Sequence, residues 1–268
     1  MTKWLRWVLI VFFSVVLVVS AYMVIDYALR SKHQANTFRD LADMVAQATP
    51  SKPSTPVPTE PGSEVEPTPE TEPPTEPGPL PEYIEVSKLN SHMVGWIRIE
   101  DTQINYPVMQ TPDSVDYYLR RDFYGEFSYH GCLYAREQCS IDPASDNITI
   151  YGHNMNDGSM FAALMKYQDK SFWETHRYIT FDTLTEHHTY EVIAVFTTTA
   201  SKGQGFSYHH FVDADSPEEF DEYIADCKAR DLYETGVTAT YGDKLITLST
   251  CEYSQKNGRF AVVAKRIS

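Results

Sequence analysis

The sequence has few cysteines, and their spacing excludes several kinds of site. Only four cysteines occur in 268 residues, at positions 132, 139, 227 and 251, and no C-x-x-C pair is present. A disulfide-dense scaffold needs more cysteines, and a zinc ribbon or a thioredoxin-like redox site needs the missing pair. The spacing leaves open whether Cys132 and Cys139 form a bridge.

Basic residues are also scarce. The chain has 22 Lys and Arg against 37 Asp and Glu, which gives a net charge of −15. Nucleic-acid binding requires Lys and Arg to displace phosphate counterions, so no nucleic-acid partner is expected. The same charge disfavours docking on an anionic lipid surface unless the chain also carries a membrane anchor.

Proline is rare except in one segment. Twelve of the sixteen prolines lie between residues 50 and 81, interleaved with Thr and Glu. Such a segment cannot build a core and favours extended polyproline II, at about 3.1 Å per residue. We therefore expect a disordered spacer, with a reach on the order of 90 Å, that lifts the following domain away from whatever precedes it.

One long apolar run is present, close to the N-terminus. Trp7 to Ile25 contains no charged residue and is about as long as a helix that spans a bilayer. Val19-Ser20-Ala21 resembles a signal-peptide cleavage site, but the apolar run continues past it. We therefore interpret residues 1–30 as an uncleaved, single-pass anchor. Two basic residues precede the run and two follow it, so charge does not set the orientation.

The remaining chain divides into two regions. In the juxtamembrane part of residues 31–82, Phe38, Leu41, Met44 and Val45 have helical spacing. Residues 83–268 form one domain with short strand-like runs, which predict a barrel or a sandwich. The expected strands cover residues 96–99, 104–106, 132–134, 147–151, 178–181, 189–197, 244–250 and 259–267.

One helix has clear boundaries within this domain. Ser216 is an N-cap candidate, Pro217 fits the first helical position, and Glu219 has the spacing of a capping box. Apolar residues then recur at helical spacing as far as Cys227, which predicts a helix over 217–230 with Cys227 inert in the core. A second, shorter helix is expected over 161–167.

Three residues at strand ends have the chemistry of a cysteine nucleophile and its partners. Cys251 closes the strand 244–250, and His153 follows another strand within Gly152-His153-Asn154. Arg259 begins the last strand, so a hairpin would place it opposite Cys251. A thiolate, a proton carrier and a cationic donor suffice for acyl transfer. Considered one at a time, these residue types more often have structural roles: cysteine and histidine in the core, and arginine in a surface ion pair.

Together with their neighbours, these residues resemble the sortase family, and class B sortases in particular. The order along the chain, histidine then cysteine then arginine, is also that of the family. The similar segments are Ile104 to Val108, Asp116 to Leu119, Tyr151 to Asn154, Thr247 to Cys251, Gly258-Arg259 and Val262 to Lys265.

The resemblance implies a closed eight-stranded β-barrel with peripheral helices and no metal or organic cofactor. Cys251 would attack a peptide bond in the C-terminal sorting motif of another exported protein and form a thioester. His153 would protonate the leaving amine, Arg259 would stabilise the oxyanion or hold the motif, and a peptidoglycan amine would resolve the thioester. By the same resemblance, Asn105, Ser249 and Glu252 line the substrate groove.

The resemblance also places the catalytic domain outside the cell membrane, facing the cell wall. The histidine pairs at 187–188 and 209–210 have no further ligand at metal-binding spacing, so we expect them in exposed loops. Two alternatives remain open. One is a wall-associated cysteine peptidase that hydrolyses its thioester, although papain-like peptidases place cysteine before histidine. The other is a tethered, non-enzymatic binding domain.

Overall fold

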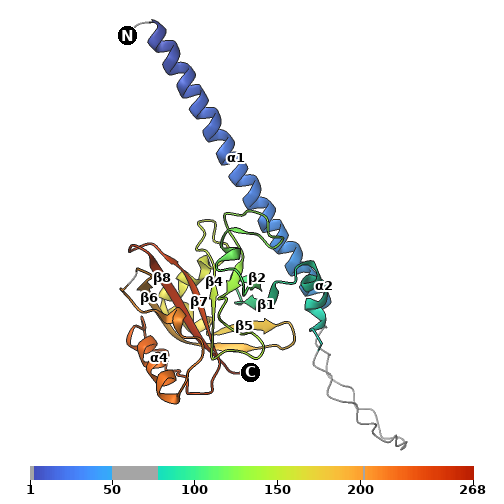
Figure 1. The fold of residues 1–268 in the computed structure, drawn as a ribbon, viewed down its shortest axis with the longest axis vertical. Coiled ribbons are helices and arrows are strands. Elements are labelled where there is room, and N and C mark those ends of the chain that lie inside the picture. The colour runs from blue at the N-terminus through green and yellow to red at the C-terminus, as the bar shows by residue number, and fades with distance from the viewer. Residues whose placement is uncertain (1–2, 50–77, 202) are drawn as a thin grey trace, which may run out of the picture.

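The structure is a computed structural model that describes residues 3–49, 78–201 and 203–268 (Figure 1). Most of the expected proline-rich spacer, residues 50–77, lies outside the described residues. The described part consists of one long N-terminal helix, one β-barrel and a set of shorter helices around the barrel.

Eight strands close into a barrel in the order β1-β2-β3-β4-β7-β8-β6-β5. The β2–β3 and β4–β7 pairs are parallel, and the other pairs are antiparallel. The predicted closed eight-stranded barrel is therefore confirmed. The strands are β1 (Met93–Arg98), β2 (Asn105–Met109), β3 (Leu133–Ala135), β4 (Asn147–Tyr151), β5 (Tyr178–Thr183), β6 (Thr189–Thr199), β7 (Leu245–Glu252) and β8 (Gly258–Arg266).

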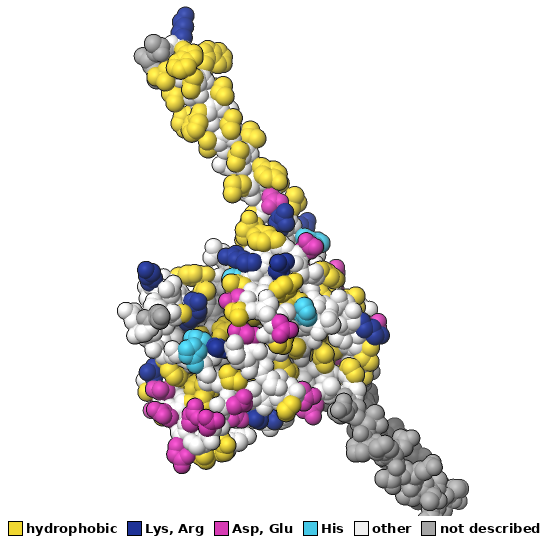
Figure 2. Space-filling model, in the orientation of Figure 1, with side chains coloured by type: hydrophobic (Ala, Val, Ile, Leu, Met, Phe, Trp, Pro, Cys, Tyr) yellow, Lys and Arg dark blue, Asp and Glu magenta, His cyan; other side chains and the backbone are white. Residues whose placement is uncertain are grey.

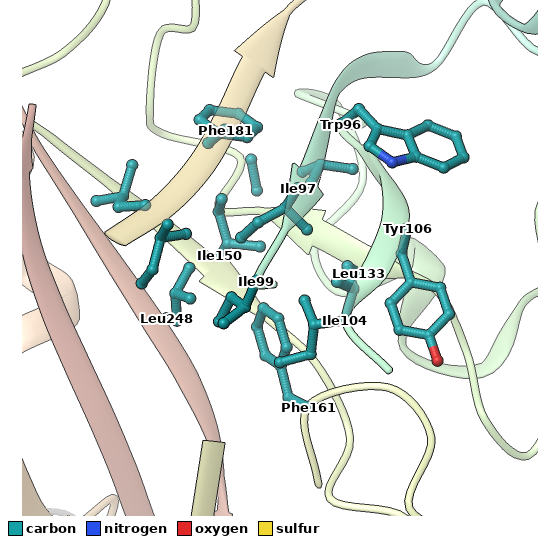
Figure 3. Close-up of a cluster of buried hydrophobic side chains, with 14 of the residues drawn as sticks. Trp96, Ile97, Ile99, Ile104, Tyr106, Leu133, Ile150, Phe161, Phe181 and Leu248 are labelled. Atoms are coloured by element: carbon teal, nitrogen blue, oxygen red, sulfur yellow. The ribbon is translucent and has the colours of Figure 1, made fainter. Parts of the chain in front are cut away.

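Aliphatic and aromatic side chains from most of these strands fill the barrel. Figure 3 shows Ile97, Ile150, Phe181 and Leu248 converging from four different strands, and all four are fully buried. β-branched and aromatic residues suit strands because they pack well on a pleated surface. Each such side chain stabilises the fold by roughly 1.5–3 kcal/mol when it is fully buried.

Helices cover the barrel at several places. Two of the shorter ones, α2 and α3, were not expected from the sequence. The α-helices are α1 (Lys3–Ala48), α2 (Pro81–Leu89), α3 (Lys170–Thr175) and α4 (Pro217–Ala229), and the 3-10 helices are η1 (Tyr117–Arg120), η2 (Ala162–Gln168) and η3 (Tyr208–His210).

The predicted capped helix is α4, which packs on the outer face of the barrel. The Ser216 hydroxyl accepts a hydrogen bond from the Glu219 N–H at 3.3 Å, as an N-cap does. The buried stripe of α4 belongs to a second apolar cluster that includes residues of β6 and β8, and Cys227 is fully buried in it. The second expected helix, over 161–167, forms as the 3-10 helix η2.

α1 is one continuous helix of two unlike halves. Its N-terminal half is exposed and apolar, and by length and composition it could cross a membrane. Its C-terminal half packs on the barrel. Leu41 and Phe38 are buried, the Phe38 ring lies 5.1 Å from that of Tyr106, and the Gln34 side chain donates to the Gly131 carbonyl at 2.6 Å. The helix expected within residues 31–49 is thus present as part of α1.

This packing changes the expected role of the proline-rich spacer. α1 precedes the spacer and α2 follows it, and the two helices pack against each other. Both ends of the spacer therefore belong to one body (Figure 1). The expectation that the spacer lifts the barrel away from the anchor is wrong, because α1 joins them directly and sets the distance between them.

The contact between α1 and the barrel can be tested with one buried leucine. Leu41→Ala should lower the free energy of unfolding of the full chain in detergent by about 2–4 kcal/mol, because it leaves a cavity against the barrel. Leu89→Ala is the matched control, since Leu89 is 48% exposed. Equal effects of the two substitutions in denaturant titrations would show that α1 does not pack as described.

Candidate active site

Parallel pairing of β4 with β7 brings the histidine and the cysteine to the same end of the barrel. In that register, Tyr151 lies beside Ser249. His153 and Cys251 each lie two residues further along, at the carboxyl ends of their strands. Because neighbouring strands are about 4.8 Å apart, two residues at matched positions on parallel strands are neighbours.

The arginine reaches this end through the β7–β8 hairpin. Cys251 is directly opposite Arg259 in the antiparallel register. Directly opposed residues project to the same face, with Cβ atoms about 4.5–5.5 Å apart. The expected hairpin is therefore confirmed, and it places Arg259 opposite Cys251.

Hydrogen bonds hold the segments around His153 and Cys251 together. The Asn154 side chain donates to the Cys251 carbonyl at 3.1 Å, and the Thr250 hydroxyl donates to the Gly152 carbonyl at 2.8 Å. Gly152 must be a glycine, because a Cβ there would lie 2.3 Å from a methyl of Leu133. The loop that carries His153 is thus fixed against the strand that carries the cysteine.

The environment of His153 favours the neutral imidazole. Burial lowers its pKa, and the nearby Arg120 and His130 lower it further, against the opposing effect of its hydrogen bond to Leu119. In that hydrogen bond, Nε2 donates to the Leu119 carbonyl at 2.8 Å. Nε2 therefore carries the hydrogen, and Nδ1 is left as the atom that can accept a proton.

A pocket of about 310 Å³ opens beside Arg259. Its wall includes Leu119, Tyr208, His209 and Arg136, so it lies between the end of the barrel that carries Arg259 and the loops around it. Two arginines, Arg136 and Arg259, and two acidic residues, Asp116 and Glu137, line this pocket, so its formal charges balance. It is the right size for a few residues of an extended peptide.

Sequence reasoning missed one residue of this pocket. His209 was expected in an exposed loop, but it is half-buried in the pocket wall, and its carbonyl accepts a hydrogen bond from Arg136. Burial, His210 and the two arginines lower the pKa of His209 to about 4. The expectation was also wrong for His188, which is buried. Burial of a histidine outside any regular apolar pattern leaves no signal in the sequence.

The three predicted substrate-binding residues occupy different surroundings. Ser249 is buried, and its hydroxyl lies 2.5 Å from that of Tyr208, a pocket residue. The Glu252 carboxylate is buried and accepts from both the N–H and the hydroxyl of Ser254, which orders the β7–β8 turn. Asn105 accepts from the Trp96 indole N–H at 2.7 Å and does not line the pocket beside Arg259. Their contact with substrate stays a prediction.

Comparison with known proteins gives one consistent result. A family model described as the sortase domain matches residues 97–267. Sortase B of Listeria monocytogenes is 34% identical over 191 residues, which cover 70% of this chain and 74% of that protein. Sortase B of Staphylococcus aureus is 31% identical over 189 residues, covering 70% and 75%.

Solved structures agree with the sequence matches. Sortase B from Bacillus anthracis in complex with AAEK2 superposes with a TM-score of 0.71 at 30% identity, covering 88% of this chain and 97% of that one. A Staphylococcus aureus sortase B–substrate complex gives a TM-score of 0.72 at 25% identity, covering 90% and 99%. The resemblance to class B sortases that the sequence suggested is therefore confirmed.

The cysteines predict a selective chemical modification. Cys132, Cys139 and Cys227 are free and buried, and burial raises their pKa values, to about 11 for Cys139 and about 12 for Cys227. Cys251 is only partly buried. Iodoacetamide should therefore add one group to the native chain, at Cys251, and none to Cys251→Ala. Modification of the other three at a comparable rate, measured by peptide mass spectrometry, would contradict this arrangement.

Proposed function

The chain belongs to the sortase family of cysteine transpeptidases, and from that premise we propose that it anchors exported proteins to the cell wall. In this proposal it is held in the membrane by α1, with the barrel outside the cell. It cleaves a C-terminal sorting motif through a thioester on Cys251 and transfers the new carboxyl end to a peptidoglycan amine.

The first half-reaction forms the thioester. The Cys251 sulfur attacks the carbonyl carbon of the scissile peptide bond, and its proton passes to His153. Arg259 stabilises the negative charge that develops on the carbonyl oxygen, because its guanidinium stays protonated at every physiological pH. The carbon–nitrogen bond then breaks, and the proton held by His153 goes to the departing amine.

The second half-reaction reverses these roles. An amine of the wall peptide attacks the thioester carbonyl, and neutral His153 removes the proton that this nitrogen must lose. The carbon–sulfur bond breaks, a new amide forms, and Cys251 regains its proton. The step requires no net oxidation or reduction, and no cofactor takes part.

One observation carries this assignment, namely the register of the strands at the catalytic end. Cys251 is opposite Arg259, and His153 follows the strand parallel to that of Cys251. The β4–β7 pairing thus brings His153, which is distant in sequence, to the end of the barrel that carries Cys251 and Arg259. The pocket beside Arg259 supports the proposal further, since it offers a place for the sorting motif.

The anchor and the compartment are supported by α1. Its exposed apolar half has a mean hydropathy of 2.9 over its best window and no buried residue in that window. A helix of that kind is stable in a bilayer and costly in water. The wall peptide and the secreted substrates are both outside the cell, so the barrel must be there as well.

Family membership affects the two alternative functions differently. Membership of a transpeptidase family removes the non-enzymatic binding domain. The cysteine peptidase differs only in what resolves the thioester, water or an amine. The Staphylococcus aureus relative was solved as a substrate complex, which supports a peptide substrate here too.

The roles of the amine and of Arg259 can be measured in one assay. We expect the full chain to join a sorting-motif peptide to an added amine, and Cys251→Ala to be inactive. Arg259→Ala should lower kcat/KM by roughly 10²–10³-fold, because an oxyanion donor is lost. Arg259→Lys is the matched control that keeps the charge and loses the planar fork of donors.

The products decide between transpeptidase and peptidase. Mass spectrometry should find the peptide joined to the amine and should find the yield rising with amine concentration. Hydrolysed product that does not depend on the amine would favour the peptidase. Full activity of Arg259→Ala would remove the arginine from the mechanism.

A further inference from the structure

The C-terminal half of α1 runs along the barrel from its catalytic end to its opposite end. At the catalytic end, the Ser31 hydroxyl lies 3.3 Å from Nε2 of His130 and 3.4 Å from the carboxylate of Asp157, four residues beyond His153. At the other end, Thr49 lines a pocket together with Ser268, the last residue of the chain. At 1.5 Å per residue, Ser31 to Thr49 spans about 27 Å, close to the length of a nine-residue strand.

The direction of α1 determines which end of the barrel is nearer to the apolar half of the helix. The apolar half of α1 leaves the barrel at the end where Ser31 contacts His130 and Asp157, and the C-terminus lies at the opposite end (Figure 1). In a membrane-anchored chain, the catalytic end of the barrel therefore faces the bilayer. The exposed apolar half of α1 ends two residues before Tyr27, whose ring is 5.5 Å from that of Tyr129 on the barrel.

A small hairpin, residues 120–130, lies at this junction and exposes aromatic rings. A bridge between Arg121 and Phe127 closes it. Tyr124 and Phe127 are 53% and 51% exposed, and Tyr129 is 38% exposed. The rings of Phe127 and Tyr129 are 5.0 Å apart, so with Tyr27 they form a continuous aromatic surface from the hairpin to the helix.

The hairpin is ordered by its own hydrogen bonds, and its two arginines are balanced by two carboxylates. The buried Asp122 carboxylate accepts from the N–H groups of Tyr124 and Glu126. Arg120 and Arg121 are exposed, against one exposed carboxylate, that of Glu126. Hydrophobic, basic and acidic side chains lie together on the surface where the barrel meets α1 (Figure 2).

We propose that the hairpin 120–130 rests on the outer surface of the bilayer. Its aromatic rings occupy the interfacial layer, where tyrosine and other amphipathic rings are enriched, and its two exposed arginines lie at the level of the headgroups. The overall acidity of the chain does not oppose this contact, because α1 already holds the barrel at the surface. The inference rests on the membrane anchoring proposed above.

The contact would also fix the orientation of the active site. The hairpin directly follows Leu119, whose carbonyl accepts the hydrogen bond from His153. Lipid contact thus holds the segment that positions the catalytic histidine and directs the pocket beside it towards the membrane surface. A soluble protein partner is less well supported, because the aromatic surface is continuous with the apolar half of α1.

Fluorescence quenching in liposomes tests the contact on the full chain. In a Cys251→Ala background the three remaining cysteines are buried, so an added surface cysteine can be labelled alone with the environment-sensitive dye NBD. Phe127→Cys and Tyr124→Cys report on the hairpin. Tyr178→Cys is the matched control, because Tyr178 is also 53% exposed but begins β5, whose register places it near the opposite end of the barrel. Val16→Cys reports on the apolar half of α1.

The liposomes contain phosphatidylcholine, phosphatidylglycerol and lipids with a nitroxide near the headgroup. We expect blue-shifted emission and nitroxide quenching at positions 127 and 124, and neither at position 178. Quenching at position 16 with none at 127 and 124 would overturn the docking proposal while leaving the membrane anchor intact. No quenching at position 16 would overturn the anchor, and the docking proposal with it.

Discussion

The hydrogen-bond register of β4, β7 and β8 is the constraint on which the site depends. β7 lies between a parallel and an antiparallel neighbour, so its carboxyl end meets both the end of β4 and the start of β8. Closure of the barrel prevents these strands from slipping, because a shift of one residue would turn every side chain to the other face. Cys251 and Arg259 gain their relative positions from this backbone, and His153 from the loop that Gly152 holds against it.

The second constraint is the rigid connection between α1 and the barrel. A helix that packs through Phe38 and Leu41 and bonds through Gln34 cannot swing freely. The orientation of the apolar half of α1 therefore fixes the orientation of the barrel.

Much of the fold and of the candidate site could be predicted from the sequence, and the features that could not be predicted have physical causes. The roles of Cys251, His153 and Arg259 were predicted from the resemblance of their neighbouring segments to sortases and stay predictions. Helix α4 was recognisable because Ser216 and Pro217 mark its start. The packing of α1 on the barrel was not predicted. Apolar residues at helical spacing show that a helix has a buried face, but they do not show what that face contacts. His209 was missed for a similar reason: its burial depends on Arg136, a residue 73 positions away.

The most direct test of the central claim is the covalent intermediate on Cys251. The full chain should be mixed with a sorting-motif peptide without added amine, quenched in acid and measured by intact mass spectrometry. We expect an adduct on Cys251 with the mass of the acyl fragment, and we expect hydroxylamine to remove it. Turnover of the peptide by the native chain with no such adduct, and equal turnover by Cys251→Ala, would contradict the claim.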